Sequence, residues 1–283
     1  MSLISAAALA ARIDDPAHRV VDVRWYLGRP GVGRVAHDAG HIPGAIFVDM
    51  DADLVAPSGP GRHPLPSPSV FAARLGALGI GSEHEVVVYD DLGGWVAARL
   101  WWMLDDLGHR SVSILDGGFQ AWVADGGAVE IGSGRAWPPA DLALASDWTK
   151  VVDRDGLRSR LGQVVVLDAR GGPRYRGEVE PIDPVAGHIP TARNAPTDGN
   201  LGPNGTFLSA ANLRLRFEGL GAAGTGFEVV NSCGSGISAC HNALAMRIAG
   251  LPDPILYPGS WSDWSTAGFP VATGPEPGEP PDR

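Results

Sequence analysis

The chain has 283 residues, a length that suggests about two domains, and 44% of its residues are hydrophobic against 19% charged. This composition excludes a disordered chain, and the net charge of −10 disfavours nucleic acid or an anionic membrane as a partner. The two cysteines, Cys233 and Cys240, are too few for a disulfide framework or a multi-cysteine zinc site, so we expect a reducing, cytoplasmic setting.

The N-terminus has no basic segment ahead of its apolar residues, and no stretch approaches 18 uninterrupted apolar residues, so we expect neither a signal peptide nor a membrane span. Continuous hydrophobic runs then predict buried strands at 20–23, 46–48, 86–89 and 113–115. Amphipathic stretches at 69–78 and 95–107 predict helices between them. Alternating strands and helices indicate a parallel α/β sheet with helices on both faces.

The second half of the chain repeats the first. Three motifs recur in the same order, 142 to 147 residues apart: Val-Val-Asp-Val-Arg from residue 20 as Val-Leu-Asp-Ala-Arg from 166, Gly-His-Ile-Pro from 40 again from 187, and Asp-Gly-Gly-Phe-Gln-Ala-Trp from 116 as Pro-Gly-Ser-Trp-Ser-Asp-Trp from 258. The repeat predicts two tandem copies of one α/β domain.

The repeat also sets the predicted domain boundaries. We expect an N-terminal domain at 1–130 and a C-terminal domain at 150–273. The segment 131–149, which contains Gly-Ser-Gly and Trp-Pro-Pro, is predicted to be a linker. The Gly- and Pro-rich segment 274–283 is predicted to be a flexible tail.

The segment with the clearest chemistry follows a strand in the second copy. Cys233 stands at the carboxyl end of that strand, where open α/β sheets place their ligands. Before the next helix come Gly234, Ser235, Gly236, Ile237 and Ser238. The glycines allow backbone N–H groups to turn inward, and together with the helix N-terminus they favour a thiolate. Cys233 is therefore predicted to be a nucleophile, and the same N–H groups suit a second sulfur attached to it.

The alternative interpretation of Cys233 is a small core residue, as many cysteines are. The glycine-rich junction of strand and helix favours the reactive interpretation. A phosphatase of related architecture needs an arginine six residues after the cysteine, where this chain has Ala239.

Together these motifs resemble the tandem-domain rhodaneses, the family of thiosulfate and 3-mercaptopyruvate sulfurtransferases. The resemblance rests on the duplicated domain, both Gly-His-Ile-Pro segments, Asp-Gly-Gly-Phe-x-x-Trp and Cys-Gly-Ser-Gly, and it covers residues 1–273. It implies that only the C-terminal copy is catalytic. The repeat offset of 142 agrees, since it puts Asp91 in the place of Cys233, and an aspartate cannot carry a persulfide.

The resemblance implies a two-step sulfur transfer. The Cys233 thiolate takes the sulfane sulfur of thiosulfate or 3-mercaptopyruvate, and a thiophilic acceptor then removes it from the persulfide. Cyanide and a dithiol such as thioredoxin are the expected acceptors, and no cofactor or metal is required. The alternative function is a non-catalytic sulfur carrier or regulatory binding module.

Both donors are anions, so cationic side chains are expected near the cysteine. Arg174 and Arg176 follow a strand of the second copy, and Arg174-Tyr-Arg-Gly resembles the family segment with a substrate-binding arginine, which Arg174 matches. The neutral residues after Cys233 resemble mercaptopyruvate enzymes. The second arginine that those enzymes carry is replaced by Ile182, so both donors stay open.

Ser235 and His41 match family positions proposed for a serine–histidine–aspartate proton relay. Asp38 is the nearest candidate for the acidic partner. The same Gly-His-Ile-Pro motif holds His188 in the second copy, which favours a structural role for that histidine. For His41 the structural and functional interpretations both stay open.

Overall fold

The structure, a computed structural model, describes residues 2–224 and 226–281, which form two compact units. Unit 1 is formed by the described residues of Met1–Ala56, Pro66–Thr149 and Gly202–Phe207, and unit 2 by those of Pro57–Leu65, Lys150–Leu201 and Leu208–Arg283. Each half of the chain therefore contributes one short segment to the unit that the other half builds. The domain boundaries predicted from the repeat, 1–130 and 150–273, instead place each of these two segments with its own half of the chain.

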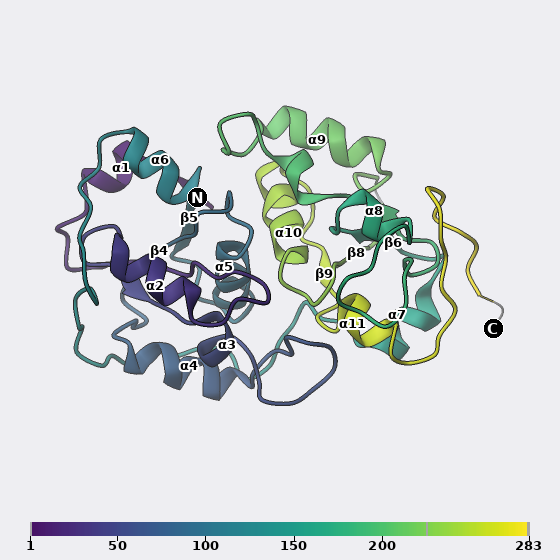
Figure 1. The fold of residues 1–283 in the computed structure, drawn as a ribbon, viewed down its shortest axis with the longest axis horizontal. Coiled ribbons are helices and arrows are strands. Elements are labelled where there is room, and N and C mark those ends of the chain that lie inside the picture. The colour runs from purple at the N-terminus through teal and green to yellow at the C-terminus, as the bar shows by residue number, and fades with distance from the viewer. Residues whose placement is uncertain (1, 225, 282–283) are drawn as a thin grey trace. The chain divides into compact units, whose positions relative to one another are not determined.

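Unit 1 contains a five-stranded parallel sheet with the strand order β1-β5-β4-β2-β3. Figure 1 shows β4 and β5 of this sheet. The strands are β1 (Leu3–Ile4), β2 (His18–Asp22), β3 (Ile46–Phe47), β4 (Glu85–Tyr89) and β5 (Val112–Leu115). The four strands predicted in the first half are confirmed as β2 to β5, and β1 was not predicted. Every residue of β2 and β3 is buried, although β2 holds His18, Arg19 and Asp22 beside its two valines.

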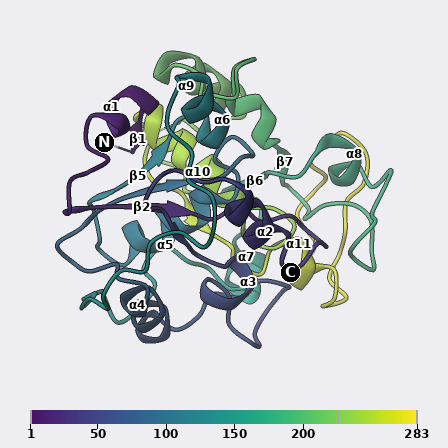
Figure 2. The ribbon, with the colours of Figure 1, turned by 60° about the vertical axis from the view of Figure 1, so that its left-hand side comes forward.

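Helices cover both faces of this sheet. They are α1 (Ala6–Ala10), α2 (Val32–Ala39), α3 (Met50–Asp53), α4 (Pro68–Ala77), α5 (Ala97–Asp106) and α6 (Gly118–Ala124). On one face, Leu9 of α1 and Trp122 of α6 share a core with Val20, Val87 and Leu115. Helix α1 lies beside β1 at the start of the chain (Figure 2), and α5 packs on β4 and β5.

Unit 2 contains a four-stranded parallel sheet with the order β7-β6-β8-β9. The strands are β6 (Val165–Asp168), β7 (Arg193–Asn194), β8 (Val229–Ser232) and β9 (Ile255–Leu256). They take the places of β2, β3, β4 and β5 of unit 1, so the predicted fold of two parallel α/β domains is confirmed. The helices are α7 (Arg154–Arg160), α8 (Gly172–Tyr175), the 3₁₀ helix η1 (Thr197–Asn200), α9 (Ala210–Gly219), α10 (Ala239–Ile248) and α11 (Ser260–Trp264).

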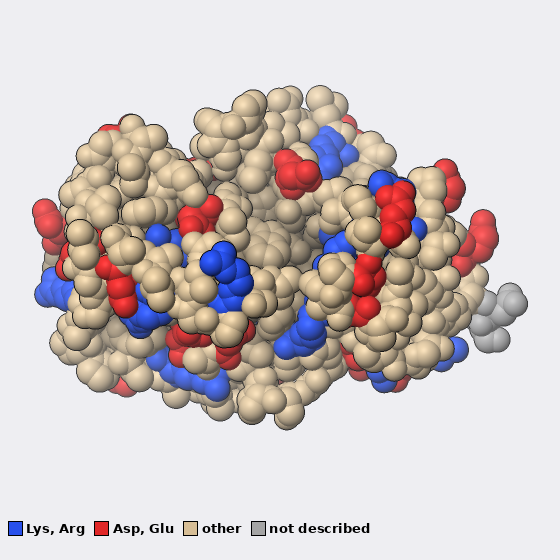
Figure 3. Space-filling model, in the orientation of Figure 1, with Lys and Arg blue, Asp and Glu red and all other residues tan. Residues whose placement is uncertain are grey.

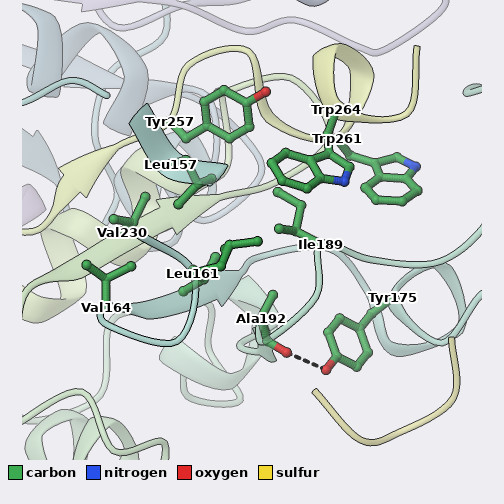
Figure 4. Packing of buried hydrophobic residues seen from close by; sticks show 11 residues of the cluster. Leu157, Leu161, Val164, Tyr175, Ile189, Ala192, Val230, Tyr257, Trp261 and Trp264 are labelled. Atoms are coloured by element: carbon green, nitrogen blue, oxygen red, sulfur yellow. Dashed lines mark hydrogen bonds between the residues drawn. The ribbon is translucent and has the colours of Figure 1, made fainter. Parts of the chain in front are cut away.

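The core of unit 2 lies between its sheet and the helices α7, α8 and α11. Figure 4 shows Trp261 and Trp264 of α11 together with Leu157 of α7, all fully buried. The Tyr175 hydroxyl donates a 2.6 Å hydrogen bond to the Ala192 carbonyl at the edge of this core. Helix α10 packs on β8 and α9, which fixes the N-terminal end of α10 at the carboxyl end of β8.

Strand register corrects one match between the two copies. Asp22 pairs with Tyr89 in unit 1, and Asp168 pairs with Ser232 in unit 2. The residue that follows the strand is therefore Asp90 in the first copy, where Cys233 stands in the second. The offset of 142, taken from the motif after β5, does not hold at β4, because the loop between Asp90 and α5 is one residue longer than the loop between Cys233 and α10.

The predicted linker and tail both make contacts within a unit. In 131–149, the Trp137 indole donates to the Gly44 carbonyl at 3.1 Å, and the Trp148 indole donates to Pro66 at 3.0 Å. In the predicted tail, the Pro277 carbonyl accepts from the Thr191 N–H at 2.7 Å. Residues 282 and 283 of that tail lie outside the described residues. Hydrogen bonds to backbone carbonyls, which Gly and Pro counts do not reveal, attach these segments.

The surface carries charges of both signs. Lysine and arginine side chains are interspersed with aspartate, glutamate and uncharged residues over the face in Figure 3. Large exposed hydrophobic side chains such as Val35, Ile131 and Leu215 are distributed over different elements. Within 2–224 and 226–281, no helix has the length and apolar character needed to cross a bilayer.

Candidate functional site

The predicted nucleophile lies where a strand gives way to a helix. Cys233 directly follows β8 and is 2% exposed, and the five loop residues between it and α10 are buried as well. The Gly236 N–H donates to Cys233 Sγ at 3.1 Å. Gly236 has φ +77°, and a Cβ there would stand 2.5 Å from the Pro258 carbonyl oxygen, so the loop geometry requires glycine. The local sequence thus brings an amide N–H onto the sulfur.

A second element holds the backbone of Cys233 in place. The Cys233 N–H donates to Ser260 Oγ at 3.1 Å, and that hydroxyl donates to the Tyr257 carbonyl at 2.8 Å. Ser260 Oγ lies 4.0 Å from Cys233 Sγ. The Trp261 N–H donates to the Cys233 carbonyl at 3.0 Å. Every backbone group of Cys233 is therefore bonded to the first turn of α11.

The partner of Ser235 is a histidine that sequence analysis did not select. His63 Nδ1 lies 2.7 Å from Ser235 Oγ, and both side chains belong to unit 2 and are buried. The expectation that paired Ser235 with His41 is thus replaced by a pair with His63. The reason is topological: the segment Pro57–Leu65 leaves the first repeat and packs in unit 2.

His41 itself has contacts of a structural kind in unit 1. It is fully buried, its Nδ1 lies 2.9 Å from the His37 carbonyl, and its ring stacks on that of His37 at 3.9 Å. The second copy repeats the arrangement, since His188 Nδ1 lies 2.8 Å from the Tyr175 carbonyl and the two rings stack at 3.8 Å. These contacts agree with the structural role predicted for His188, which stays a prediction, and His41 makes the same kind of contacts.

Arg174 reaches the loop of the cysteine. Its Nη2 donates to Glu180 at 2.6 Å and to Asp183 at 3.1 Å, and its Nε donates to Glu180 at 3.2 Å. Its other terminal nitrogen, Nη1, lies 3.5 Å from the point at which a Cβ would stand on Gly234. The side chain is 20% exposed, so it combines fixed orientation with access from solvent.

Arg176 is placed differently. Its guanidinium makes a two-point ion pair with Glu178, at 2.7 and 2.8 Å, and the Glu178 side chain is 55% exposed. Within the described part of the chain, the hydrogen bonds of the Arg176 guanidinium go to Glu178 and not to the Cys233 loop. The two arginines of Arg-Tyr-Arg therefore lie in different environments, and only Arg174 adjoins the cysteine loop.

A compact charge cluster surrounds Arg174. It consists of Arg62, Arg170 and Arg174 with Asp168, Glu180 and Asp183. Burial raises the pKa of Asp183 above its ordinary value, against the attraction of Arg62. Burial would also raise the pKa of Glu180, but its hydrogen bonds from Arg174 and from backbone N–H groups outweigh burial and lower that pKa. The cluster holds equal numbers of basic and acidic groups.

Several residues of the site were missed by sequence analysis: Arg62, His63, Glu180, Asp183 and Ser260. Arg62 and His63 lie within Gly-Pro-Gly-Arg-His-Pro, where two charged or titratable side chains stand in an otherwise turn-forming segment. Charged or titratable side chains within a turn-forming segment were therefore the feature by which Arg62 and His63 could have been selected from the sequence. Glu180 and Asp183 flank Ile182, the position at which an expected arginine is missing, but the sequence analysis assigned no role to their carboxylates.

A rhodanese-like domain family model matches the chain twice, at residues 5–125 and 153–267. Over 279 residues the chain is 47% identical to a protein of Pseudomonas aeruginosa named probable 3-mercaptopyruvate sulfurtransferase, covering 96% of this chain and 98% of that one. It is 41% identical to a putative thiosulfate sulfurtransferase, SseB, of Mycobacterium tuberculosis, covering 93% and 94%. The structure of the 3-mercaptopyruvate sulfotransferase SseA of Escherichia coli matches with a TM-score of 0.81 at 33% identity, covering 93% of this chain and 100% of that one.

The fold and these matches define the class: the chain belongs to the rhodanese family, with two rhodanese-like domains in tandem. Curated relatives with 47, 37 and 35% identity, covering most of the chain, are named as sulfurtransferases. The chain is accordingly an enzyme of the sulfurtransferase class.

Proposed function

We propose that this enzyme transfers a sulfane sulfur from an anionic donor, 3-mercaptopyruvate or thiosulfate, to a thiophilic acceptor through a persulfide on Cys233. The observation that carries the proposal is the Gly236 N–H, 3.1 Å from Cys233 Sγ, in a buried loop at the carboxyl end of β8. An amide dipole at that distance stabilises negative charge on sulfur.

The first copy supports the idea that this loop type gathers amides around the residue that follows the strand. In unit 1 the Asp90 carboxylate accepts four backbone hydrogen bonds of 2.7 to 2.9 Å, from Leu92, Gly94, Val96 and Ala97. The Asp90 carboxylate therefore occupies the space between these four backbone N–H groups. In the second copy the thiol is shorter, and the outer sulfur of a persulfide would extend into the corresponding space.

The chemistry of the two donors balances without a cofactor. The Cys233 thiolate attacks the sulfane sulfur, a new S–S bond forms, and the bonding pair of the old S–S or C–S bond leaves with sulfite or with pyruvate enolate. The enolate takes up a proton, and the donor thiol loses one. Ser235 belongs to the cysteine loop, and its hydroxyl is hydrogen-bonded to the titratable ring of His63, so we assign this pair to the proton transfer.

Donor binding falls to Arg174 in this proposal. Arg174 Nη1 adjoins Gly234, and a guanidinium donates to carboxylate or sulfonate oxygens in fixed directions. Arg176, paired with Glu178 at the surface, and His41, stacked on His37, are given no part in it.

The second step passes the outer sulfur to an acceptor. Cyanide accepts it in vitro, and a dithiol such as thioredoxin accepts it by forming a disulfide as the sulfur leaves as sulfide. Such an acceptor implies a reducing compartment, in keeping with the cytoplasm. No disulfide joins Cys233 and Cys240.

The test is the intact mass of the protein after incubation with each donor in the absence of reductant. We expect a gain of one sulfur, which cyanide removes, and we expect no gain in Cys233→Ser. A gain retained by Cys233→Ser would contradict the assignment of the nucleophile. No gain from either donor would favour the non-catalytic binding module.

A further inference from the structure

We propose that Arg62 is a second donor-binding residue, and that Arg62 and Arg174 together form one site for an oxyanion, a carboxylate or sulfonate oxygen beside the sulfane sulfur. The inference rests on the proposed function for the identity of the donor. The anion site itself is a property of unit 2 that binding measurements reach directly.

The backbone of Arg62 is fixed from both sides. Gly61 has φ +76°, and a Cβ there would lie 2.5 Å from the Gly259 carbonyl oxygen, so this segment packs closely against the turn before α11. The Arg62 N–H donates to Ser262 Oγ at 3.0 Å. The next residue, His63, contacts Ser235 of the cysteine loop. These contacts hold the backbone of Arg62 in a defined position beside the cysteine loop.

The two guanidiniums converge on one point. The position of a Cβ on Gly234 lies 3.1 Å from Arg62 Nη2 and 3.5 Å from Arg174 Nη1. Both guanidiniums therefore border the same face of Gly234, so a ligand oxygen in van der Waals contact with that face can accept hydrogen bonds from both arginines. Gly234 directly follows Cys233, and because it has no side chain, no Cβ separates the guanidiniums from a ligand on that face.

Asp183 holds the pair from the other side. Its two carboxylate oxygens bind Arg62 and Arg174 respectively, and its side chain is 4% exposed. The arginine side chains are 25% and 20% exposed, so each has a buried anchor and an accessible end. Arg62 Nε is buried without a hydrogen-bond partner in the described part of the chain, so Asp183 does not use all of its donors.

The test uses the full-length Cys233→Ser variant, which cannot take up sulfur and so lets each donor bind without reacting. Isothermal titration with 3-mercaptopyruvate and, separately, with thiosulfate gives Kd. Adding Arg62→Gln should raise Kd about ten- to a hundredfold, the usual loss for a charged hydrogen bond. If Arg62→Gln raises the Kd of both donors, the site binds the carboxylate of 3-mercaptopyruvate as well as the sulfonate of thiosulfate. If it raises the Kd of one donor only, the site is specific for the oxyanion of that donor.

Arg214→Gln in the same background is the matched control, because Arg214 is an exposed arginine of unit 2 paired with Glu218 on α9. It should leave Kd unchanged. Arg62→Lys keeps the charge and should give an intermediate Kd, which guards against a folding defect in Arg62→Gln.

The inference would be overturned if Arg62→Gln left the Kd of both donors unchanged. It would also be overturned if neither donor bound to Cys233→Ser. If the wild-type protein gains no sulfur while Cys233→Ser binds a donor through Arg62, the proposed function fails and the anion site stands.

Discussion

Ser260 differs from the matching residue of the first copy by a hydroxyl group that contacts Cys233. It has φ +52°, a left-handed conformation that is uncommon for serine, and its hydroxyl accepts the Cys233 N–H. The corresponding residue of the first copy, Gly118, has φ +60°, and a Cβ there would stand 2.3 Å from the Asp90 carbonyl oxygen. The backbone bend is thus common to both copies, and the hydroxyl is present only beside the cysteine.

Replacement of Ser260 separates these two contributions. Ser260→Ala and Ser260→Gly both remove the acceptor of the buried Cys233 N–H, which should cost about 1–3 kcal/mol of unfolding free energy. Glycine relieves the positive φ, so Ser260→Gly should be more stable than Ser260→Ala by about 0.5–1 kcal/mol. Hydrogen exchange of the β8 amides in both variants checks this. An alanine variant as stable as the glycine variant would mean that the bend carries no strain.

At the scale of elements, the segment Pro57–Leu65 decides the composition of the site. It has no regular secondary structure, yet it supplies Arg62 and His63 to unit 2. In the second repeat the segment Gly202–Phe207 lies between β7 and α9, as Pro57–Leu65 lies between β3 and α4. It packs in unit 1 through a 2.9 Å hydrogen bond from the Phe207 N–H to Asp116.

Gly61→Ala should displace this segment. A Cβ at Gly61 would meet the Gly259 carbonyl oxygen at 2.5 Å and Ser262 Oγ at 2.8 Å, so the backbone must move away. We expect trypsin to cleave after Arg62 several-fold faster in the variant than in the wild type, since a protease needs an accessible, flexible segment. Mass spectrometry of a timed digest measures the rate.

The matched control for this variant is Gly205→Ala. Gly205 has the same φ of +76° but no atom within 4 Å of its Cβ position, so it carries the conformational cost without the collision. Cleavage after Arg62 should keep its wild-type rate in this control. Equal rates in Gly61→Ala and the wild type would show that the contact with Gly259 does not hold the segment.

At the scale of the whole molecule, each unit has its own sheet and its own core. Leu9 and Trp122 lie in the core of unit 1, and Leu157 and Trp261 lie in that of unit 2. A chain with two cores need not unfold in one step, so a single melting temperature is a poor measure of its stability. Hydrogen exchange, which reports on each sheet separately, is better suited.

Leu157→Ala should lower the protection of amides in β6 and β8. Leu157 is fully buried, and removing its side chain leaves a cavity that should cost about 2–5 kcal/mol. Leu215→Ala on α9 is the control, since Leu215 is 66% exposed and its truncation should change stability by less than about 0.5 kcal/mol. Unchanged exchange in β8 of Leu157→Ala would mean that this core does not support the strand that presents Cys233.

The sequence by itself determined the duplication, the parallel α/β class, strands β2 to β5 and the cysteine loop, because these depend on hydrophobic patterning and on motifs contiguous along the chain. Only the tertiary structure decided that Asp90 rather than Asp91 matches Cys233, since that match follows from strand register. It also decided that His63 contacts Ser235 and that Arg62 joins Arg174 at Gly234. Arg62 and His63 stand more than 100 positions before Arg174, Gly234 and Ser235, and contacts at that separation arise from packing between segments, which no local spacing encodes.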